Sequence, residues 1–477
     1  MSAPSPSSVR FQYRTRLAAL LLPVALTVVG CSDDDKSAVT DGSSTSDAAS
    51  DGGTSDAAPA VVTFDEVAPI LADKCVRCHH DGGIAPFRLD SYEMAVQKGA
   101  LAKVAITTGL MPPYYIHHDG TCGDFAATEA LTATEQATLV AWIDGGMHAG
   151  TGGSAVGPAT PSATLTNPQE MKTPKFMPAP LGTQVAKDDD YRCFLMDPAV
   201  TTDKFITGYE VEPGNATIVH HVLGFVVDPN KMTKNGKTNA AVMQELDAKS
   251  PDIIGWDCFG GAGDGIEEES VPVDWAPGQG AVPYPAKMGV PIKAGSKVVV
   301  QIHYNLADPK NVGMMDSTAV RLQYADAVDR KLVFMLPDAF LESLYAKDMP
   351  DSLAPGQKLI PYSWTKSAEM LGLAAPLPYA DLIAVMPHMH QRGTGLELRL
   401  APDKTTPATC TAKTDRWDFH WQKMYFYKTP PRLTPASQIS VTCDYDTSAD
   451  KTPVMPGWGT KNEMCLTVLM LALPPGM

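Results

Sequence analysis

Short runs of apolar residues, separated by turns rich in Gly, Pro and Asp, recur through the C-terminal two-thirds of the chain. Apolar and polar positions often alternate within a run, which is the period of a β-strand with one buried face. Long helical periodicity is scarce in this region. The pattern predicts a pair of β-sandwiches, with strands within residues 218–227, 297–306, 381–390, 395–400, 439–445 and 464–473.

A helical pattern precedes these runs, within residues 62–150. Residues 64–74 read as one helix, and a capping box, Thr132-Ala-Thr-Glu135, opens another. Leu139, Trp142 and Ile143 fall on one face of that second helix, and two glycines at 145 and 146 end it. We therefore expect a small α-helical domain before the β region.

The first 31 residues have the layout of a secretory signal, with three arginines before an apolar run at 17–29 that is too short to span a bilayer. The run ends in Val28-Val29-Gly30-Cys31, which resembles the bacterial lipobox, so Cys31 is expected to carry a lipid. An ordinary signal peptide with an incidental cysteine is the alternative. Residues 32–61 are rich in Ser, Asp and Gly and have no aromatic residue, which predicts a disordered acidic tether.

Composition and charge restrict the partners of the chain. Its 477 residues include 40 Pro and 38 Gly, which suits many turns between short strands. The formal net charge of −16 repels phosphate backbones, so no nucleic acid partner is expected.

The signal and lipobox predict that the protein lies in the cell envelope of a Gram-negative bacterium. It would be anchored by lipid to a membrane, on the periplasmic side or at the outer membrane.

Cys75-Val-Arg-Cys78-His79 has the spacing of a c-type haem attachment site. The two thiols can bond the two vinyl groups of one haem, and His79 then stands next to the iron as an axial ligand. A redox dithiol and half of a zinc site are the alternatives for the motif alone. With the helix before it and the capped helix after it, the motif resembles a class I cytochrome c, which implies one covalently bound haem c.

The second axial ligand of this haem is predicted to be Met111. Leu110-Met111-Pro112-Pro113 resembles the Met-Pro-Pro sequence of many c-type cytochromes, and His/Met ligation raises the potential of a haem. His80, His117 and His118 are the nearby alternatives.

Five of the eleven histidines fall inside the predicted strands of the β region, in three clusters. His388 and His390 share one face of a strand because side chains alternate. His220 and His221 face opposite sides of a regular strand, and both reach one ion only at a strand end or a bulge. Together with His303 they predict metal binding, although imidazole alone does not select among zinc, copper, iron and nickel.

These clusters, in their order along the chain, resemble the motifs of the copper type II, ascorbate-dependent monooxygenases. The resemblance covers about residues 170–477 and rests on His220-His221, Gln301-Ile-His303, Pro387-His388-Met-His390 and Glu463-Met464-Cys465. It implies two tandem antiparallel jelly-roll-like β-sandwich domains, each carrying one copper ion.

The resemblance also implies the ligand sets. His220, His221 and His303 would hold the electron-transfer copper, while His388, His390 and Met464 would hold the catalytic copper at which oxygen binds. Gln301 matches a glutamine of the family. Cys465 would be disulfide-bonded, with Cys443 as the nearest partner, and Cys193 could pair with Cys258; Cys122 and Cys410 are left unassigned.

Three positions depart from the peptide-amidating members of the family, which hold a substrate carboxylate there with Arg, Asn and Tyr. This chain has Met386, Leu466 and Val468 instead. A carboxylate would lack its charge-assisted donors, so the substrate is expected to be apolar or neutral.

The predicted organisation and function follow. The domains are a lipoprotein signal (1–31), a tether (32–61), a cytochrome c domain (62–150), a linker (151–167) and two copper monooxygenase domains (168–325 and 326–477). The predicted activity is hydroxylation of a C–H bond of a small molecule by O2. Electrons are expected to pass from an electron donor through the haem, with ascorbate or another reductant as the source of electrons. A non-catalytic copper and haem electron-transfer lipoprotein is the alternative.

Overall fold

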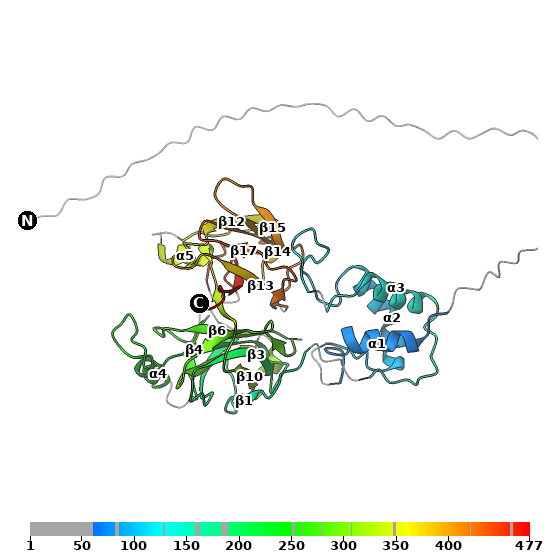
Figure 1. Ribbon diagram of the computed structural model, residues 1–477. Helices are drawn as coiled ribbons and strands as arrows, with labels where there is room; N and C mark the ends of the chain where they lie inside the picture. The colour runs from blue at the N-terminus through cyan, green and yellow to red at the C-terminus, as the bar shows by residue number, and fades with distance from the viewer. Residues whose placement is uncertain are drawn as a thin grey trace, which may run out of the picture. The chain divides into compact units, whose positions relative to one another are not determined.

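The computed structural model describes residues 61–81, 85–126, 129–157, 163–182, 189–249, 253–259, 261–277, 279–306, 308–346, 350–419, 421–457 and 461–477. All of them belong to one unit, Pro59–Met477. The predicted signal segment, Cys31 and nearly all of the predicted tether lie outside the described residues. The described part is mostly β, as expected, with three helices preceding the first strand (Figure 1). No helix in this part is long and apolar enough to cross a membrane.

The helices before the first strand are α1 (Phe64–Lys74), α2 (Tyr92–Thr107) and α3 (Ala133–Asp144). Capping boxes open α1 and α3, and α3 ends at Gly145, so both helices predicted from the sequence are confirmed. Their apolar faces meet in one core, where the ring of Phe64 lies 5.2 Å from that of Tyr92 and 5.8 Å from that of Trp142.

The next region has a five-stranded sheet in the order β5-β2-β9-β4-β6. Its strands are β2 (Asp189–Met196), β4 (Val219–Val227), β5 (Trp256–Asp257), β6 (Ser270–Trp275) and β9 (Lys297–Asn305). One face packs into the main core together with strands of a second sheet. The other face is covered by α4 (Asn239–Asp247).

The second sheet has ten strands and runs through both β regions, in the order β1-β10-β3-β8-β11-β19-β13-β16, with β7 paired to β3 and β17 to β13. Its first half contains β1 (Gln169–Lys172), β3 (Lys204–Glu212), β7 (Val282–Pro283), β8 (Met288–Ile292) and β10 (Ala319–Ala325). Its second half contains β11 (Arg330–Met335), β13 (Ala380–His388), β16 (Tyr425–Phe426), β17 (Arg432–Leu433) and β19 (Leu466–Ala472). The halves join where β8 and β11 pair in parallel.

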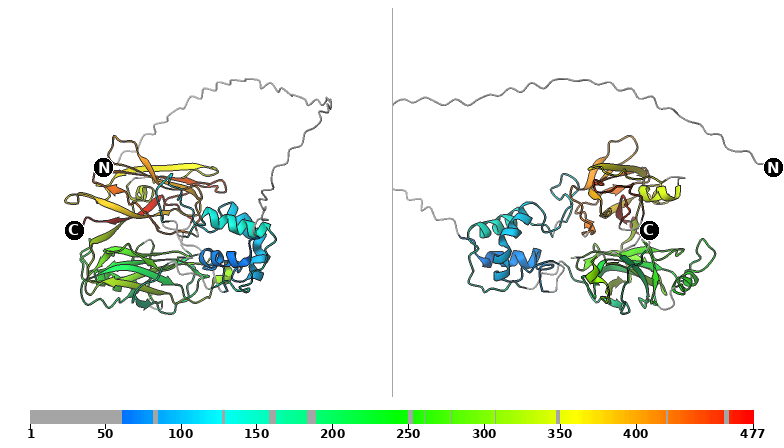
Figure 2. Two further views of the ribbon diagram at one scale, coloured as in Figure 1. Left: turned by 45° about the vertical axis from the view of Figure 1, so that its right-hand side comes forward. Right: turned by 180° about the vertical axis from the view of Figure 1, so that it is seen from behind.

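A four-stranded sheet, in the order β12-β18-β14-β15, shares a separate core with the second half of the long sheet. Its orange and yellow strands lie over the strands of the long sheet in Figure 2. Its strands are β12 (Ile360–Ser367), β14 (Gly393–Ala401), β15 (Thr409–Thr414) and β18 (Gln438–Tyr445). The helix α5 (Ala339–Ala346) lies between β11 and β12 in the chain, and a short 3-10 helix (Pro309–Asn311) lies between β9 and β10. All six predicted runs contain a strand.

The strands β13 and β19 are buried on both faces. Leu469 and Leu471 belong to the core of the four-stranded sheet, whereas Leu466, Val468 and Met470 belong to the core shared with the five-stranded sheet. Two apolar faces explain why β19 is apolar at almost every position. They also place the ends of these strands where the two β regions meet.

Three disulfides tie this framework together: Cys193–Cys258, Cys443–Cys465 and Cys122–Cys410. The first two are the pairs that the family resemblance implied. The third joins the segment after α2 to β15, and the sequence had left both of its cysteines unassigned.

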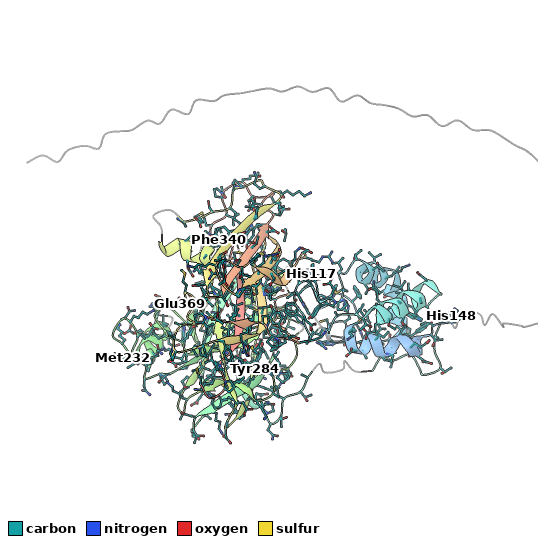
Figure 3. All side chains as sticks on the ribbon, turned by 45° about the horizontal axis from the view of Figure 1, so that its top comes forward. His117, His148, Met232, Tyr284, Phe340 and Glu369 are labelled. Carbon is teal, nitrogen blue, oxygen red and sulfur yellow. A yellow bond between two sulfur atoms is a disulfide. The ribbon has the colours of Figure 1, made fainter. Side chains whose placement is uncertain are left out.

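In addition to forming this disulfide, the segment after α2 packs against the second β region. Ile116 and Phe125 are buried in the core of the four-stranded sheet. His117, labelled in Figure 3, places its Nε2 2.7 Å from an oxygen of Asp415. The helical region is therefore joined to the β region by a disulfide, buried apolar contacts and a polar contact.

Candidate functional site

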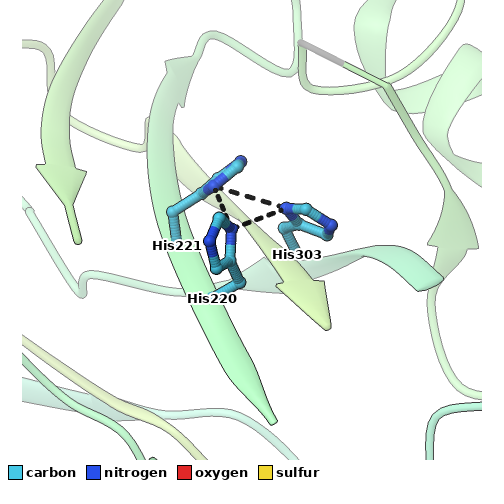
Figure 4. Close-up of side chains that lie close together, drawn as sticks. All are labelled: His220, His221 and His303. Atoms are coloured by element: carbon cyan, nitrogen blue, oxygen red, sulfur yellow. Dashed lines mark hydrogen bonds between the residues drawn. The ribbon is translucent and has the colours of Figure 1, made fainter. Parts of the chain in front are cut away.

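Three histidines of the five-stranded sheet lie together on β4 and β9 (Figure 4). His221 is paired with His303 across the two strands, while the register shifts between Val219 and His221. The shift is a β-bulge at His220, and it brings the ring of His220 to the ring of His221. Because of this bulge, the adjacent residues His220 and His221 can face one ion, which a regular strand would not allow.

The Nδ1 atoms of these rings form a triangle. His220 and His221 are 3.2 Å apart at Nδ1, and each lies 3.3 Å from Nδ1 of His303. His303 Nε2 is buried 3.4 Å from Asp189 Oδ1 and makes no hydrogen bond among the described residues. Burial, and then the neighbouring rings, lower the pKa of His221 well below its ordinary value.

This trio fits a metal ion. A neutral ring nitrogen either donates or accepts, so three Nδ1 atoms at these distances cannot satisfy one another by hydrogen bonds. The centre of a triangle with 3.3 Å sides is about 1.9 Å from each corner, close to the ~2.0 Å of a metal–imidazole bond. Copper and zinc both accept such a set.

A second pair of histidines lies at the end of β13. The rings of His388 and His390 are 5.3 Å apart and nearly perpendicular. His388 Nδ1 lies 2.7 Å from Gln422 Oε1, and His390 Nδ1 lies 3.0 Å from the carbonyl oxygen of Asn462. Both oxygens are acceptors, so each Nδ1 donates and each Nε2 keeps its lone pair for another ligand. Burial lowers the pKa of His388 to about 4.

Met464 joins this pair through the pairing of β13 with β19. His388 lies opposite Leu466 in the ladder, and Met464, two residues before Leu466, is buried at the same end of the sheet. Glu463 holds the turn after β13 in place, since its carboxylate accepts hydrogen bonds from the backbone N–H groups of His390 and Arg392 at 2.8 and 2.7 Å. Burial raises the pKa of Glu463 to about 8.

One cavity, partly open to solvent, is lined by residues of both clusters: His221, His388, His390 and Met464. Met386, Leu466 and Val468 also line it, so the three departures from the amidating enzymes are part of its wall. Gln301 lines it as well, while its Nε2 donates to the carbonyl of Gly261 at 2.7 Å. Two imidazole clusters and a largely apolar chamber thus lie together.

Phe419, Gln422 and Asp274 are among the residues of this cavity that were not singled out from the sequence. Phe419 stacks on His220 with ring centroids 4.8 Å apart, and Gln422 orients His388. Neither has a sequence signal, because both lie in an irregular segment between β15 and β16. Asp274 is a charged residue within a strand of otherwise mostly apolar residues, which could have marked it.

The carboxyl group of Asp274 has one buried oxygen, Oδ2, that forms no hydrogen bond within the described residues. Burial raises its pKa to about 7, so the neutral form persists to near-neutral pH. A neutral carboxyl on the cavity wall can donate or accept one hydrogen bond to a bound molecule.

Replacing Asp274 with Asn is expected to stabilise the metal-free protein at pH 8 and to leave it nearly unchanged at pH 4. The folded-state pKa is raised, so the wild type loses stability as the pH rises from about 4 to about 7, and the amide avoids this loss. We expect a gain on the order of 2 kcal/mol at pH 8, below the full conversion of the shift because the group faces a cavity. Thermal unfolding at both pH values measures it; an equal gain at pH 4 and pH 8 would contradict this reading.

Cys75, Cys78 and His79 of the Cys75-Val-Arg-Cys78-His79 motif line a second cavity. Cys75 and Cys78 are not joined in a disulfide, which leaves both thiols free. His79 is buried, and its Nδ1 lies 2.9 Å from the carbonyl of Phe87, so Nδ1 donates and Nε2 keeps its lone pair. Burial lowers the pKa of His79.

Met111 lines the same cavity as Cys75, Cys78 and His79, whereas the three alternative histidines do not. His80 is exposed, with its Nδ1 2.8 Å from the carbonyl of Asp81. His117 and His118 line a separate surface hollow. Among the four candidates for the second ligand, the structure brings only Met111 to the cavity of the motif.

Comparison with known proteins matches both β regions to one family. Residues 180–311 match the N-terminal domain, and residues 364–474 the C-terminal domain, of the copper type II ascorbate-dependent monooxygenases, together about half of the chain.

Similar curated proteins include tyramine beta-hydroxylase of Caenorhabditis briggsae (25% identity over 58% of this chain and 42% of that protein) and human DBH-like monooxygenase protein 1 (24%, 60% and 44%). Dopamine beta-hydroxylase of Rattus norvegicus is 24% identical over 62% of this chain and 47% of its own length. The chain thus spans less than half the length of these relatives. The two domain matches, in the order and over the strands that carry the histidines, show that the chain belongs to the copper type II ascorbate-dependent monooxygenase family.

Proposed function

We propose that this protein is a copper-dependent monooxygenase that hydroxylates a C–H bond of a small apolar or neutral molecule with O2. The single observation that carries the proposal is the cavity shared by the two imidazole clusters, since it joins two predicted metal sites to a space for substrate. The reaction takes two electrons and two protons, places one oxygen atom in the product and releases the other as water.

His220, His221 and His303 would hold one copper ion, and His388, His390 and Met464 the other. Bound copper supplies one-electron redox chemistry and a site for O2, and the thioether of Met464 favours its reduced form. The chain itself fixes the tautomers of His388 and His390 through Gln422 and the carbonyl of Asn462. Burial, which lowers the pKa of His388, also keeps that imidazole neutral, as metal ligation requires.

The substrate would lie against the apolar wall that includes Met386, Leu466 and Val468. No charged donor at these three positions is available for a carboxylate, so a substrate ending in a carboxylate is disfavoured. The unpartnered Oδ2 of Asp274 would accept a hydrogen bond from a neutral hydroxyl or amide group of the substrate. Such a substrate is mostly apolar with one polar group.

Residues 62–150 would form a cytochrome c domain with one haem bonded to Cys75 and Cys78 and ligated by His79 and Met111. All four residues line one apolar cavity, which supports this proposal. The haem would receive single electrons from an external donor and supply them to copper. Lipidation of Cys31 would hold the protein at a membrane of the cell envelope.

Incubation of the copper-loaded, reduced protein with 18O2 and a panel of small apolar compounds tests the proposed activity. We expect one 18O atom in a hydroxylated product, and turnover of a glycine-extended peptide at least about tenfold slower than that of the best apolar substrate. Oxygen consumption without any labelled product would instead favour the electron-transfer protein, and efficient peptide turnover would refute the proposed substrate class.

A further inference from the structure

One short segment of the second β region forms part of the wall of the cavity that holds the Cys75-Val-Arg-Cys78-His79 motif. Asp418 and Trp421, between β15 and β16, line that cavity together with Cys78 and Met111. The proposed haem site is therefore completed by residues that follow β15, outside the helical region.

The same segment contacts both histidine clusters. Phe419 stacks on His220, with ring centroids 4.8 Å apart and planes at 25°, and meets His390 edge-on at 6.0 Å. Gln422 Oε1 accepts a hydrogen bond from His388 Nδ1 at 2.7 Å. Within a few residues, the chain passes from the proposed haem cavity to both proposed copper sites.

Hydrogen bonds and an ion pair hold this segment in place. The backbone N–H of Trp421 donates to the carbonyl of Asp418 at 3.0 Å, and Gln422 Nε2 donates to the carbonyl of Phe419 at 2.8 Å. Lys423 is buried and forms an ion pair with Glu129 of the helical region, to which Arg77 also bonds at 3.2 Å. The contacts of Trp421 and Phe419 are thus fixed relative to the Cys-X-X-Cys motif.

Trp421 also has an unused donor. Its Nε1–H is buried and has no hydrogen-bond partner among the described residues, although a buried indole usually finds one. Because Trp421 lines the proposed haem cavity, a carboxylate of the haem edge is an acceptor of the right chemistry for this group. This unsatisfied donor is independent of the contacts that Phe419 makes.

We infer that Trp421 and Phe419, two positions apart in one segment, carry single electrons from the haem to the copper held by His220, His221 and His303. The inference rests on the proposed function, because it needs both the haem and the copper. In each step one ferrous haem is oxidised to ferric and one Cu(II) is reduced to Cu(I). An external one-electron donor, a small redox protein or ascorbate, then reduces the haem again.

Flash photolysis of the full-length protein carrying haem and Cu(II), without oxygen, tests this path. A photo-reduced flavin reduces the haem, and the decay of the ferrous α-band then reports electron transfer to copper. We expect Trp421→Leu and Phe419→Leu each to slow this decay on the order of tenfold or more. Phe419→Tyr, which keeps the ring, should restore it, and Trp421→Phe should keep the rate while shifting the haem potential through loss of the N–H group.

The matched control is Phe426→Leu, the same substitution in β16 at a side chain that lines neither cavity, and it should leave the decay unchanged. Copper content by electron paramagnetic resonance and haem content by absorbance establish that each variant is loaded. Unchanged decay in both Leu variants overturns the path while leaving the proposed function intact. A wild-type protein without covalent haem, or one whose haem never reduces copper, overturns the path together with the haem part of the proposed function.

Discussion

Replacing Met464 with Leu is expected to reduce hydroxylation by about a hundredfold or more while leaving the fold intact. Leucine has nearly the same volume and polarity, so the buried position next to β19 should tolerate it. It has no sulfur, however, and the site with His388 and His390 would keep two imidazoles and lose the soft ligand that favours reduced copper. Product formation and X-ray absorption of the reduced copper protein measure the two effects.

Met389→Leu is the control. Met389 lies between His388 and His390 in the sequence and is fully buried, but it belongs to the core of the four-stranded sheet and does not line the cavity. The same chemical change there should leave activity and the copper–sulfur signal in place. Full activity of Met464→Leu, or an equal loss in both variants, would rule out Met464 as a ligand.

The positions of the strands could be predicted from the sequence, but their pairing across the two β regions could not. Alternation identifies a strand with one buried face, and β18 follows it closely. β13 and β19 are buried on both faces, so their apolar runs indicate a strand without indicating its neighbours. β8 and β11 pair in parallel through tertiary packing, and no pattern in the sequence of either strand indicates this pairing.

The histidines of the candidate site could be found because imidazole is rare in strands and because their order resembles that of a family. The sequence could state only a condition for His220 and His221 to bind the same ion: adjacent residues within one strand need a bulge to do so. That bulge lies between Val219 and His221. Its position is set by the ladder with β9, which is a property of two strands and not of one.

Phe419, Trp421 and Gln422 show where sequence reasoning stops. They lie in an irregular segment, and the partner of each is distant in the chain: Phe419 stacks on His220, Gln422 hydrogen-bonds to His388, and Trp421 lines the cavity that contains Cys78. No periodicity links such residues. The disulfide Cys122–Cys410, which joins the helical region to β15, was left open for the same reason.

Replacing His79 with Ala is expected to slow the reduction of copper by a redox-protein donor on the order of tenfold or more, with copper content unchanged. His79 is the buried imidazole of the proposed haem cavity, and its Nδ1–H bond to the carbonyl of Phe87 leaves Nε2 for iron. Without it the haem would lose one axial ligand, and both its absorbance spectrum and its potential would change. Ascorbate, a small molecule that can reach copper without the haem, should still support turnover of the variant.

His80→Ala separates this role from a general effect of removing an imidazole. The two histidines are adjacent, but His80 is exposed and does not line the haem cavity. Its replacement should therefore leave the haem spectrum and the rate of copper reduction as in the wild type. If donor-driven copper reduction in His79→Ala also matched the wild type, the haem would have no part in the electron supply. Both copper ions would then have to receive their electrons directly from a reductant in solution.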